Sequence, residues 1–232
     1  MSVFHLTNVE IEALELSLRV SLFAVIASLP LGVLIAWILA RKTFPGKILV
    51  DGLVHLPLVL PPVVTGYLLL VIMGRQGILG KWLFENLDVT FAFNWKGAAL
   101  AAAVMAFPLL VRAVRLSVEA VDRGLEEAAR TLGAGPVRVF FTITIPLILP
   151  GILTGSILAF ARSIGEFGAT ITFVSNIPGE TQTLPLALYT LTQVPDGEVG
   201  AMRLCLISVA VAMAALVASE MVSSRVQARI RG

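Results

Sequence analysis

The sequence has few charged residues and almost none of the groups that enzymes use. Only 14% of its 232 residues are Asp, Glu, Lys or Arg, against about 25% in a typical soluble domain. Its one cysteine, Cys205, excludes an intrachain disulfide. The sequence has no His/Cys cluster with metal-ligand spacing, no glycine-rich phosphate loop and no nucleophile elbow. We therefore expect no catalytic residue, metal or cofactor in this chain, and any nucleotide that it depends on must bind to another chain.

Long apolar segments make up most of the chain instead. Hydrophobic residues account for 57% of it, and the mean hydropathy is +0.93. A membrane-spanning helix needs about 20 mostly apolar residues. Five segments meet this requirement, at about residues 20–40, 52–73, 97–114, 147–167 and 204–222. The sequence therefore predicts an all-α polytopic protein with a single membrane domain over residues 1–232. The first segment lacks a preceding basic region and a cleavage site, so we expect a retained anchor.

The positions of Lys and Arg predict the orientation, because cytoplasmic loops carry an excess of them. One set of connections holds Arg41, Lys42, Lys47, Arg112, Arg115, Arg123, Arg130, Arg138, Arg225, Arg229 and Arg231. The opposite set holds only Arg19, Arg75, Lys81, Lys96 and Arg203. The richer side is expected in the cytoplasm, so five spans place the C-terminus in the cytoplasm and the N-terminus outside.

An unusually long connection, residues 168–202, is expected on the outer side. It contains an apolar stretch at residues 184–193 that is too short to span. The stretch is predicted to form a short helix or a re-entrant hairpin. A sixth span is rejected, because it would move the arginine-rich C-terminus outside.

The most distinctive motif follows the third apolar segment, in a loop at about residues 119–140. Its members are Glu127, Ala128, Ala129, Arg130, Gly133 and, at the end of the pattern, Pro146. Residues 126–132 favour a short helix, Gly133 can end it in a left-handed conformation, and Pro136 can begin a second helix. The alternative is an ordinary amphipathic loop helix, which the fixed spacing of the pattern makes the weaker interpretation.

The second apolar segment is interrupted by three prolines, Pro57, Pro61 and Pro62, with Thr65 close behind. Proline removes a backbone donor and breaks the helical hydrogen-bond ladder. In lipid, the freed carbonyls must be satisfied by neighbouring helices or by water. We therefore expect this segment in the protein interior, lining a translocation path and contributing to its gate. A kinked packing helix without any contact to a ligand is the alternative.

The fourth segment contains an ionisable pair, Arg162 and Glu166, spaced to meet on one helix face. Charges within a span are costly unless they face the interior of the bundle. Two roles remain open: an ion pair that fixes packing, or an arginine that attracts an anion near the outer end of the path.

These motifs carry a family resemblance. The stretch from Glu127 to Pro146 resembles the signature loop of the permease subunits of binding-protein-dependent ABC importers, which have Leu in place of Ile145. Residues 56–67, and the Gly-Glu-Phe-Gly-Ala-Thr stretch that begins at Gly165, are similar to the molybdate permeases of that group. Sulfate and thiosulfate permeases share Gly-Glu-Phe-Gly but usually continue with Ser and lack the later Pro-Gly-Glu-Thr stretch. The similarity runs through nearly the whole chain.

The resemblance implies a type I ABC importer permease fold in a bacterial inner membrane. It implies a homodimer whose signature loops dock as coupling helices on two cytoplasmic ATPase subunits, and a periplasmic molybdate-binding protein that delivers molybdate, and tungstate too, for transport by alternating access. A sulfate permease is the nearest alternative. A secondary anion transporter is a more distant one, because such proteins use acidic groups near the midplane and only Glu166 qualifies.

Overall fold

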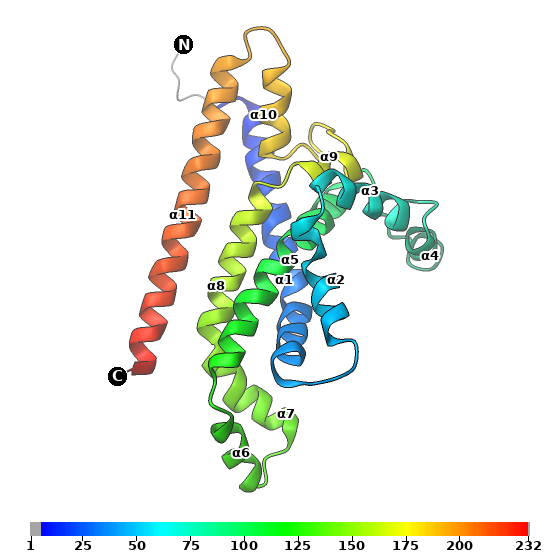
Figure 1. The fold of residues 1–232 in the computed structure, drawn as a ribbon. Coiled ribbons are helices and arrows are strands. Elements are labelled where there is room, and N and C mark those ends of the chain that lie inside the picture. Colours follow the sequence, from blue (N-terminus) through cyan, green and yellow to red (C-terminus); the bar gives the residue numbers. More distant parts are fainter. Residues whose placement is uncertain (1–5, 232) are drawn as a thin grey trace.

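The computed structural model describes residues 6–231, with the side chains of all of these except 219, 222, 223 and 225–231. The latter include Arg225, Arg229 and Arg231, which were counted for the orientation. The described chain is entirely helical and turn-connected (Figure 1). Its helices are α1 (Asn8–Arg41), α2 (Lys47–Val59), α3 (Pro62–Met73), α4 (Ile78–Leu87), α5 (Trp95–Ala120), α6 (Arg123–Thr131), α7 (Pro136–Val139), the π-helical turn η1 (Phe140–Thr144), α8 (Ile145–Ile164), α9 (Gly168–Val174), α10 (Leu184–Thr192) and α11 (Glu198–Arg231).

Four helices, or helix runs, are long and apolar enough to cross a membrane, and the bent pair α2–α3 makes a fifth crossing if it counts as one. The four are α1, α5, the continuous run from α7 to α8, and the first part of α11. The predicted all-α membrane fold is confirmed. Most of these helices are longer than the apolar segments predicted from the sequence, because the helical conformation continues into the polar residues at their ends.

Three of these helices, α1, α5 and α8, pack together as the centre of the molecule (Figure 1). Small residues let their backbones approach closely, as is usual between membrane helices. On α8, a Cβ atom at Gly155 would lie 3.1 Å from that of Ala113, and one at Gly151 would collide with Ser117. On α1, a Cβ atom at Gly32 would lie 2.8 Å from Leu110 Cδ2. These glycines therefore set the spacing of the three helices.

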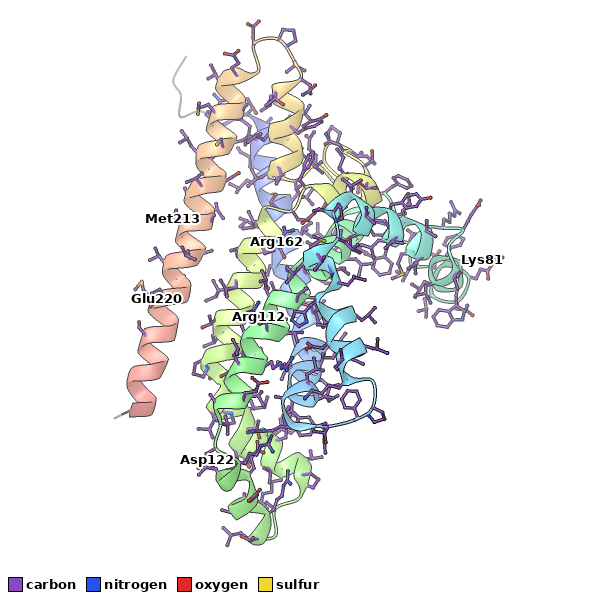
Figure 2. The ribbon with its side chains drawn as sticks, in the orientation of Figure 1. Lys81, Arg112, Asp122, Arg162, Met213 and Glu220 are labelled. Atoms are coloured by element: carbon purple, nitrogen blue, oxygen red, sulfur yellow. The ribbon has the colours of Figure 1, made fainter. Side chains whose placement is uncertain are left out.

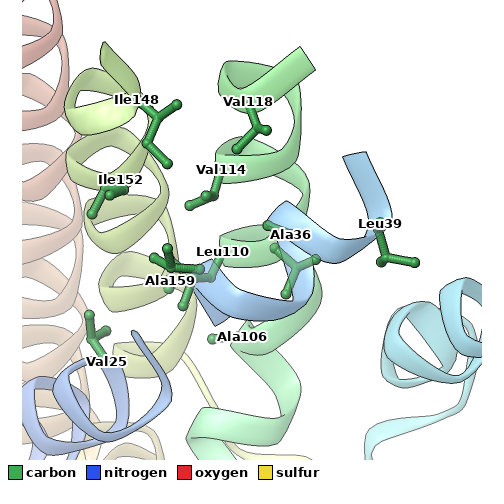
Figure 3. Close-up of a cluster of buried hydrophobic side chains, with 12 residues drawn as sticks. Val25, Ala36, Leu39, Ala106, Leu110, Val114, Val118, Ile148, Ile152 and Ala159 are labelled. Carbon is green, nitrogen blue, oxygen red and sulfur yellow. The ribbon is translucent and has the colours of Figure 1, made fainter. Parts of the chain in front are cut away.

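Larger apolar side chains fill the space that these close contacts leave. Figure 3 shows the main cluster, to which α5 contributes Leu110, Val114 and Val118, while α8 contributes Ile148 and Ile152. All three α5 side chains are fully buried. The core therefore lies along α5, which has the largest buried share of the four spanning candidates.

The second apolar segment is two helices rather than one. α2 and α3 meet at Leu60 and Pro61 with a bend of 116°. The break has a local cause: Pro61 takes an extended conformation before α3, and Pro62 occupies the first turn, where a missing N–H costs nothing. The helix break predicted from the prolines within residues 52–73 is therefore present, and its sharpness means that the segment does not form one straight helix.

The fourth apolar segment also ends earlier than expected. α8 stops at Ile164, and after Gly165 and Glu166 the chain turns into α9. The span predicted to reach residue 167 is thus three residues too long. The long connection that follows contains α10, a nine-residue helix, too short to cross a bilayer. Two short helices were not predicted: α9, at the start of this connection, and α4, which projects from the bundle beyond α3 (Figure 1).

α11 lies at the edge of the molecule and contacts α8 and α10. Only 6% of its most apolar window is buried, which leaves residues such as Met213 exposed (Figure 2). Its first turns are fixed to α1 by an ion pair, in which Arg203 Nη2 and Nε donate to Glu10 Oε1 at 2.7 and 3.1 Å. Glu10 also closes the N-terminus of α1, because Thr7 N–H donates to its Oε2 at 2.7 Å.

The Glu10–Arg203 pair predicts a specific dependence on charge and pH. Burial opposes ionisation of Glu10, but the hydrogen bonds from Thr7 and Arg203 outweigh it and lower its pKa below the ordinary 4.5. Its stabilisation is therefore complete above pH 4.5 and is lost as the pH falls toward the lower folded-state pKa. Replacing Arg203 by Met leaves a buried carboxylate unpaired and should cost about 3 kcal/mol.

Thermal unfolding of the detergent-solubilised protein measures both effects. We expect Arg203→Met alone to be less stable than Glu10→Gln with Arg203→Met, and the acid-dependent loss below pH 4.5 to be smaller in the double variant. Equal stability of the single and double variants would contradict this account of the pair.

Candidate functional site

The signature loop forms a protruding helical turn at one end of the bundle (Figure 1). Asp122 caps α6, with Gly124 N–H donating to its Oδ1 at 2.8 Å. At the other end Gly133 has φ +86°, its N–H donates to the Arg130 carbonyl at 2.9 Å, and Ala134 N–H donates to the Ala129 carbonyl at 3.0 Å. These two bonds define a Schellman cap, which favours glycine at the left-handed position.

The predicted coupling residues lie on the surface of this loop. Glu127, Ala128 and Arg130 are exposed and Ala129 is half-buried. Two apolar side chains are exposed beside them, Leu132 at 89% and Leu125 at 50%. Exposed leucines next to a charged motif are typical of a surface that a protein partner covers.

The neighbouring Glu126, which the motif did not single out, is the buried member of the loop. Its Oε1 accepts from Thr144 Oγ1 at 2.9 Å and lies 3.3 Å from Arg41 Nη2. Arg41 also donates to the Val121 carbonyl at 2.9 Å. One carboxylate thus joins α6 to the end of α1 and to the start of α8. The sequence motif includes the adjacent Glu127 but not Glu126. The anchoring role of Glu126 could have been inferred from the sequence only from the side of the helix on which the residue lies.

Pro146 lies apart from the loop, in the second position of α8. The turn before it is π-helical, with Ile145 N–H donating to the Phe140 carbonyl. A π-helical turn in a helix often marks a functional position, and here it precedes a proline that cannot donate to the ladder. The π-helical turn connects α7 to α8, so the helical conformation is continuous from Pro136 to Ile164.

The second predicted site, around the prolines, is formed where α3 crosses α9. A Cβ atom at Gly66 would lie 2.5 Å from the Ala169 carbonyl oxygen, and one at Gly168 would lie 2.8 Å from Pro62 Cβ. Thr65 is buried there, and its hydroxyl has no partner among the described residues. The structure thus brings the proline segment and the Gly-Glu-Phe-Gly stretch together. Pro57 lies elsewhere, beside an apolar groove between α1, α2 and α5.

Arg162 and Glu166 form the expected ion pair, but Glu166 lies just beyond the end of α8. Arg162 Nη1 is 2.7 Å from Glu166 Oε2, and the Glu166 side chain is only 2% exposed against 29% for Arg162. The other carboxylate oxygen accepts from Ala169 N–H at 2.8 Å. Glu166 therefore caps α9 while it pairs with α8. Figure 2 shows Arg162 far along the bundle from Asp122, so the two candidate sites lie at different levels.

A charged network that the sequence reading missed holds α2 against α5. Arg115 Nη1 lies 3.0 Å from both carboxylate oxygens of Asp51, and its Nε donates to Glu119 at 2.9 Å. His55 Nδ1 is 3.2 Å from Asp51 Oδ1. Since α2 has no buried residues, this network is its main polar attachment. Asp51 was not singled out from the sequence, because its partner is 64 positions away along the chain.

This arrangement of helices defines the class of protein. The chain matches the model of the family described as "Binding-protein-dependent transport system inner membrane component" over residues 28–229 and belongs to that family. A solved bacterial ABC transporter involved in the import of the acidic polysaccharide alginate has the same fold, with a TM-score of 0.73 at 19% identity, covering 95% of this chain and 80% of that one. The fold is therefore that of a type I ABC importer permease, an inner-membrane protein.

Individual relatives narrow the comparison. The chain is 66% identical over 215 residues to the molybdenum transport system permease protein ModB of Escherichia coli (strain K12), covering 93% of this chain and 94% of that protein. It is 39% identical over 181 residues to a probable sulfate transport system permease protein of Chlorokybus atmophyticus, covering 78% of this chain and 63% of that protein. The molybdenum permease is thus similar along its whole length and the sulfate permease only along part.

The α3–α9 contact predicts that Gly66 tolerates no side chain. Gly66→Ala places a methyl group 2.5 Å from a backbone oxygen and must push α3 away from α9. We expect a destabilisation of about 1–3 kcal/mol, as for other overpacked sites. The matched control is Gly52→Ala in α2, where nothing lies within 4 Å and the usual helix preference should give a gain of up to about 1 kcal/mol. Equal unfolding temperatures for the two variants would refute the contact.

The Arg162–Glu166 pair predicts a non-additive response. Arg162→Met strands a buried carboxylate and should cost about 3 kcal/mol or more. Combining it with Glu166→Gln removes the stranded charge and keeps an oxygen that can accept from Ala169 N–H, so the double variant should be more stable than the single one. Thermal unfolding and the yield of folded protein measure this order. A double variant less stable than Arg162→Met would contradict the explanation that the single variant is destabilised by the unpaired Glu166 carboxylate.

Proposed function

We propose that this chain is the membrane-spanning subunit of an ATP-driven importer of molybdate, and of tungstate as well. The observation that carries the proposal is the 66% identity to a molybdenum transport permease over nearly its whole length. The sulfate permease is the second candidate, and its weaker, partial similarity makes it the less favoured one. The signature stretch after Gly165 supports the same choice, since it continues with Ala169 rather than Ser.

The partners follow from the energetics of the substrate. A dianion that enters a cell 100 mV negative inside works against about 4.6 kcal/mol, at about 2.3 kcal/mol per charge. An energy source is therefore needed, and the sequence has no glycine-rich phosphate loop with which this chain could bind a nucleotide itself. We infer that two ATPase subunits bind the exposed signature loops and hydrolyse ATP. A periplasmic binding protein delivers the oxyanion, and the C-terminus lies in the cytoplasm.

A second copy of the chain completes the path. α2 has no buried residue and α11 is only 6% buried over its apolar window, so both helices have faces free for a partner subunit or lipid. In a homodimer, the two α2–α3 bends line a shared path between the subunits. Pro61, Pro62 and Thr65 form the gate region, and Pro57 lies below it in α2 beside the apolar groove. Arg162 and Glu166 stabilise the gate region indirectly, because Glu166 binds the first turn of α9, which packs against α3.

Uptake of labelled oxyanion tests the function directly. The test uses cells that lack a molybdate importer of their own. When they express this chain together with its partner ATPase and periplasmic binding protein, they should take up molybdate. Tungstate should compete with it at similar concentration, while sulfate competes only at large excess. Uptake of sulfate in preference to molybdate would transfer the assignment to the sulfate permeases. Uptake that persists without ATP would instead favour a secondary transporter.

Coupling to the ATPase depends on the loop that Gly133 terminates. Gly133→Val places a β-branched residue at φ +86° and should disturb the cap by about 1 kcal/mol or more. No atom lies within 4 Å of the new Cβ atom, so the effect is conformational rather than steric. We expect normal insertion, reduced uptake and poor co-purification of the ATPase.

Gly135→Val is the matched control for this variant. Gly135 also has nothing within 4 Å, but its φ of −66° suits any residue. The control should retain both uptake and the ATPase. Full uptake and normal ATPase recovery in Gly133→Val would rule out the coupling role of this turn.

A further inference from the structure

A basic cavity lies between the end of α1 and α6, and it shares Glu127 and Arg130 with the predicted coupling surface. Its volume is about 160 Å³. Its lining residues are Trp37, Arg41 and Lys42 from α1, and Arg123, Glu126, Glu127 and Arg130 from α6. Four cationic groups therefore face two carboxylates. The cavity has an excess of positive charge in a chain that carries few charges.

The two carboxylates of the cavity do not fully neutralise its four cationic groups. Arg41 pairs with Glu126, but Lys42, Arg123 and Arg130 have no ion-pair partner within the described part of the chain. The Arg41 side chain is only 8% exposed, and its buried Nε has no hydrogen-bond partner among the described residues. An unpaired buried guanidinium nitrogen costs free energy unless an acceptor reaches it. The cavity can therefore accommodate a further anionic group that offers several acceptor atoms to these cations.

The position of the cavity restricts the source of that anion. Arg41 and Lys42 directly follow the apolar part of α1, where the bilayer core gives way to the headgroups. Trp37 is half-buried beside them, and Lys42 Nζ lies 5.5 Å from the centre of its ring. Tryptophan and lysine at such a depth are typical of the membrane interface. Basic pockets on the cytoplasmic side of membrane helices are suited to anionic headgroups.

We propose that this cavity binds the phosphate headgroup of an anionic phospholipid from the cytoplasmic leaflet. The phosphate oxygens accept from Arg41 and Arg123, while Lys42 supplies a further charge at the rim. Such a lipid bridges α1 and α6 beside the Glu126 anchor and so stabilises the position of the coupling loop. The proposal concerns lipid binding alone and does not depend on which oxyanion is transported.

Fluorescence of Trp37 provides the measurement. The chain has three tryptophans, and replacing Trp82 and Trp95 by Phe leaves Trp37 as its only one; the Trp37 signal is the difference from the same complex that also carries Trp37→Phe. The full chain, with its co-purifying subunits, is placed in nanodiscs of neutral phosphatidylcholine. Phosphatidylglycerol or phosphatidylcholine with a nitroxide near the carbonyl end of one acyl chain is then titrated in. We expect labelled phosphatidylglycerol to quench Trp37 at much lower mole fraction than labelled phosphatidylcholine.

Removing charge from the cavity should abolish this preference. Lys42→Gln with Arg123→Gln should weaken the binding of phosphatidylglycerol roughly 30-fold, at about 1 kcal/mol per basic group. Lys47→Gln with Arg138→Gln removes the same charge from cytoplasmic positions outside the cavity lining and should leave most of the preference intact. Retention of the preference in the first double variant, or an equal loss in both, would overturn the proposal.

A final arm separates lipid from soluble anion. Inorganic phosphate, added at millimolar concentration at constant ionic strength, should leave the quenching by labelled phosphatidylglycerol unchanged. Displacement of the lipid by phosphate in the reporter protein, but not by an equal charge of chloride, would assign the cavity to a free oxyanion and reject the phospholipid. Equal quenching by both labelled lipids would likewise reject it.

Discussion

Inside a bilayer the backbone finds no water, and this constraint decides where the chain can be irregular. Helices satisfy their own backbone groups, so every break at membrane depth needs a neighbour that supplies partners. The chain breaks at Leu60 and Pro61 and again at Gly165 and Glu166, and these breaks are packed against each other through α3 and α9. Glu166 supplies the acceptor that the first turn of α9 would otherwise lack. Each interruption thus depends on the other.

The same constraint explains how much the sequence could predict. Apolar length and charge placement identify spanning helices, since both are properties of a segment by itself. The bend of 116° between α2 and α3 could not be predicted, because prolines locate a break but the packing of Gly66 on Ala169 sets its angle. The end of α8 at Ile164 was missed for a related reason. Glu166 continues the helical spacing in the sequence, while in the structure its carboxylate is used to cap the next helix.

The polar anchors were harder to predict than the motifs. Glu127, Ala128 and Gly133 follow a pattern that is visible along the chain, whereas Glu126 acquires its role from Arg41, 85 positions earlier, and from Thr144, 18 positions later. The Asp51–Arg115 contact is similarly long-range. The spacing of residues along a segment indicates which side chains that segment exposes to a partner. Which charge is buried depends on which helices meet, and the local spacing of residues along the sequence does not show that.

α8 connects the two candidate sites. At its start, Thr144 hydrogen-bonds to Glu126 under the coupling loop; at its end, Arg162 pairs with Glu166, which caps α9 against α3. The twenty residues of α8 span about 30 Å at about 1.5 Å per residue. Gly151 and Gly155 hold α8 close to α5, so sliding of α8 along α5 is sterically limited. The two helices meet less resistance when they move together as a rigid body. A displacement of the signature loop would thus reach the α2–α3 bend through polar bonds at both ends of one helix. Pro150 lies inside α8, between Thr144 and Arg162, and is the position where this helix can bend. The part that follows it, Gly151–Ile164, has no proline and therefore suits transmission of the displacement from Pro150 to Arg162 without a further bend.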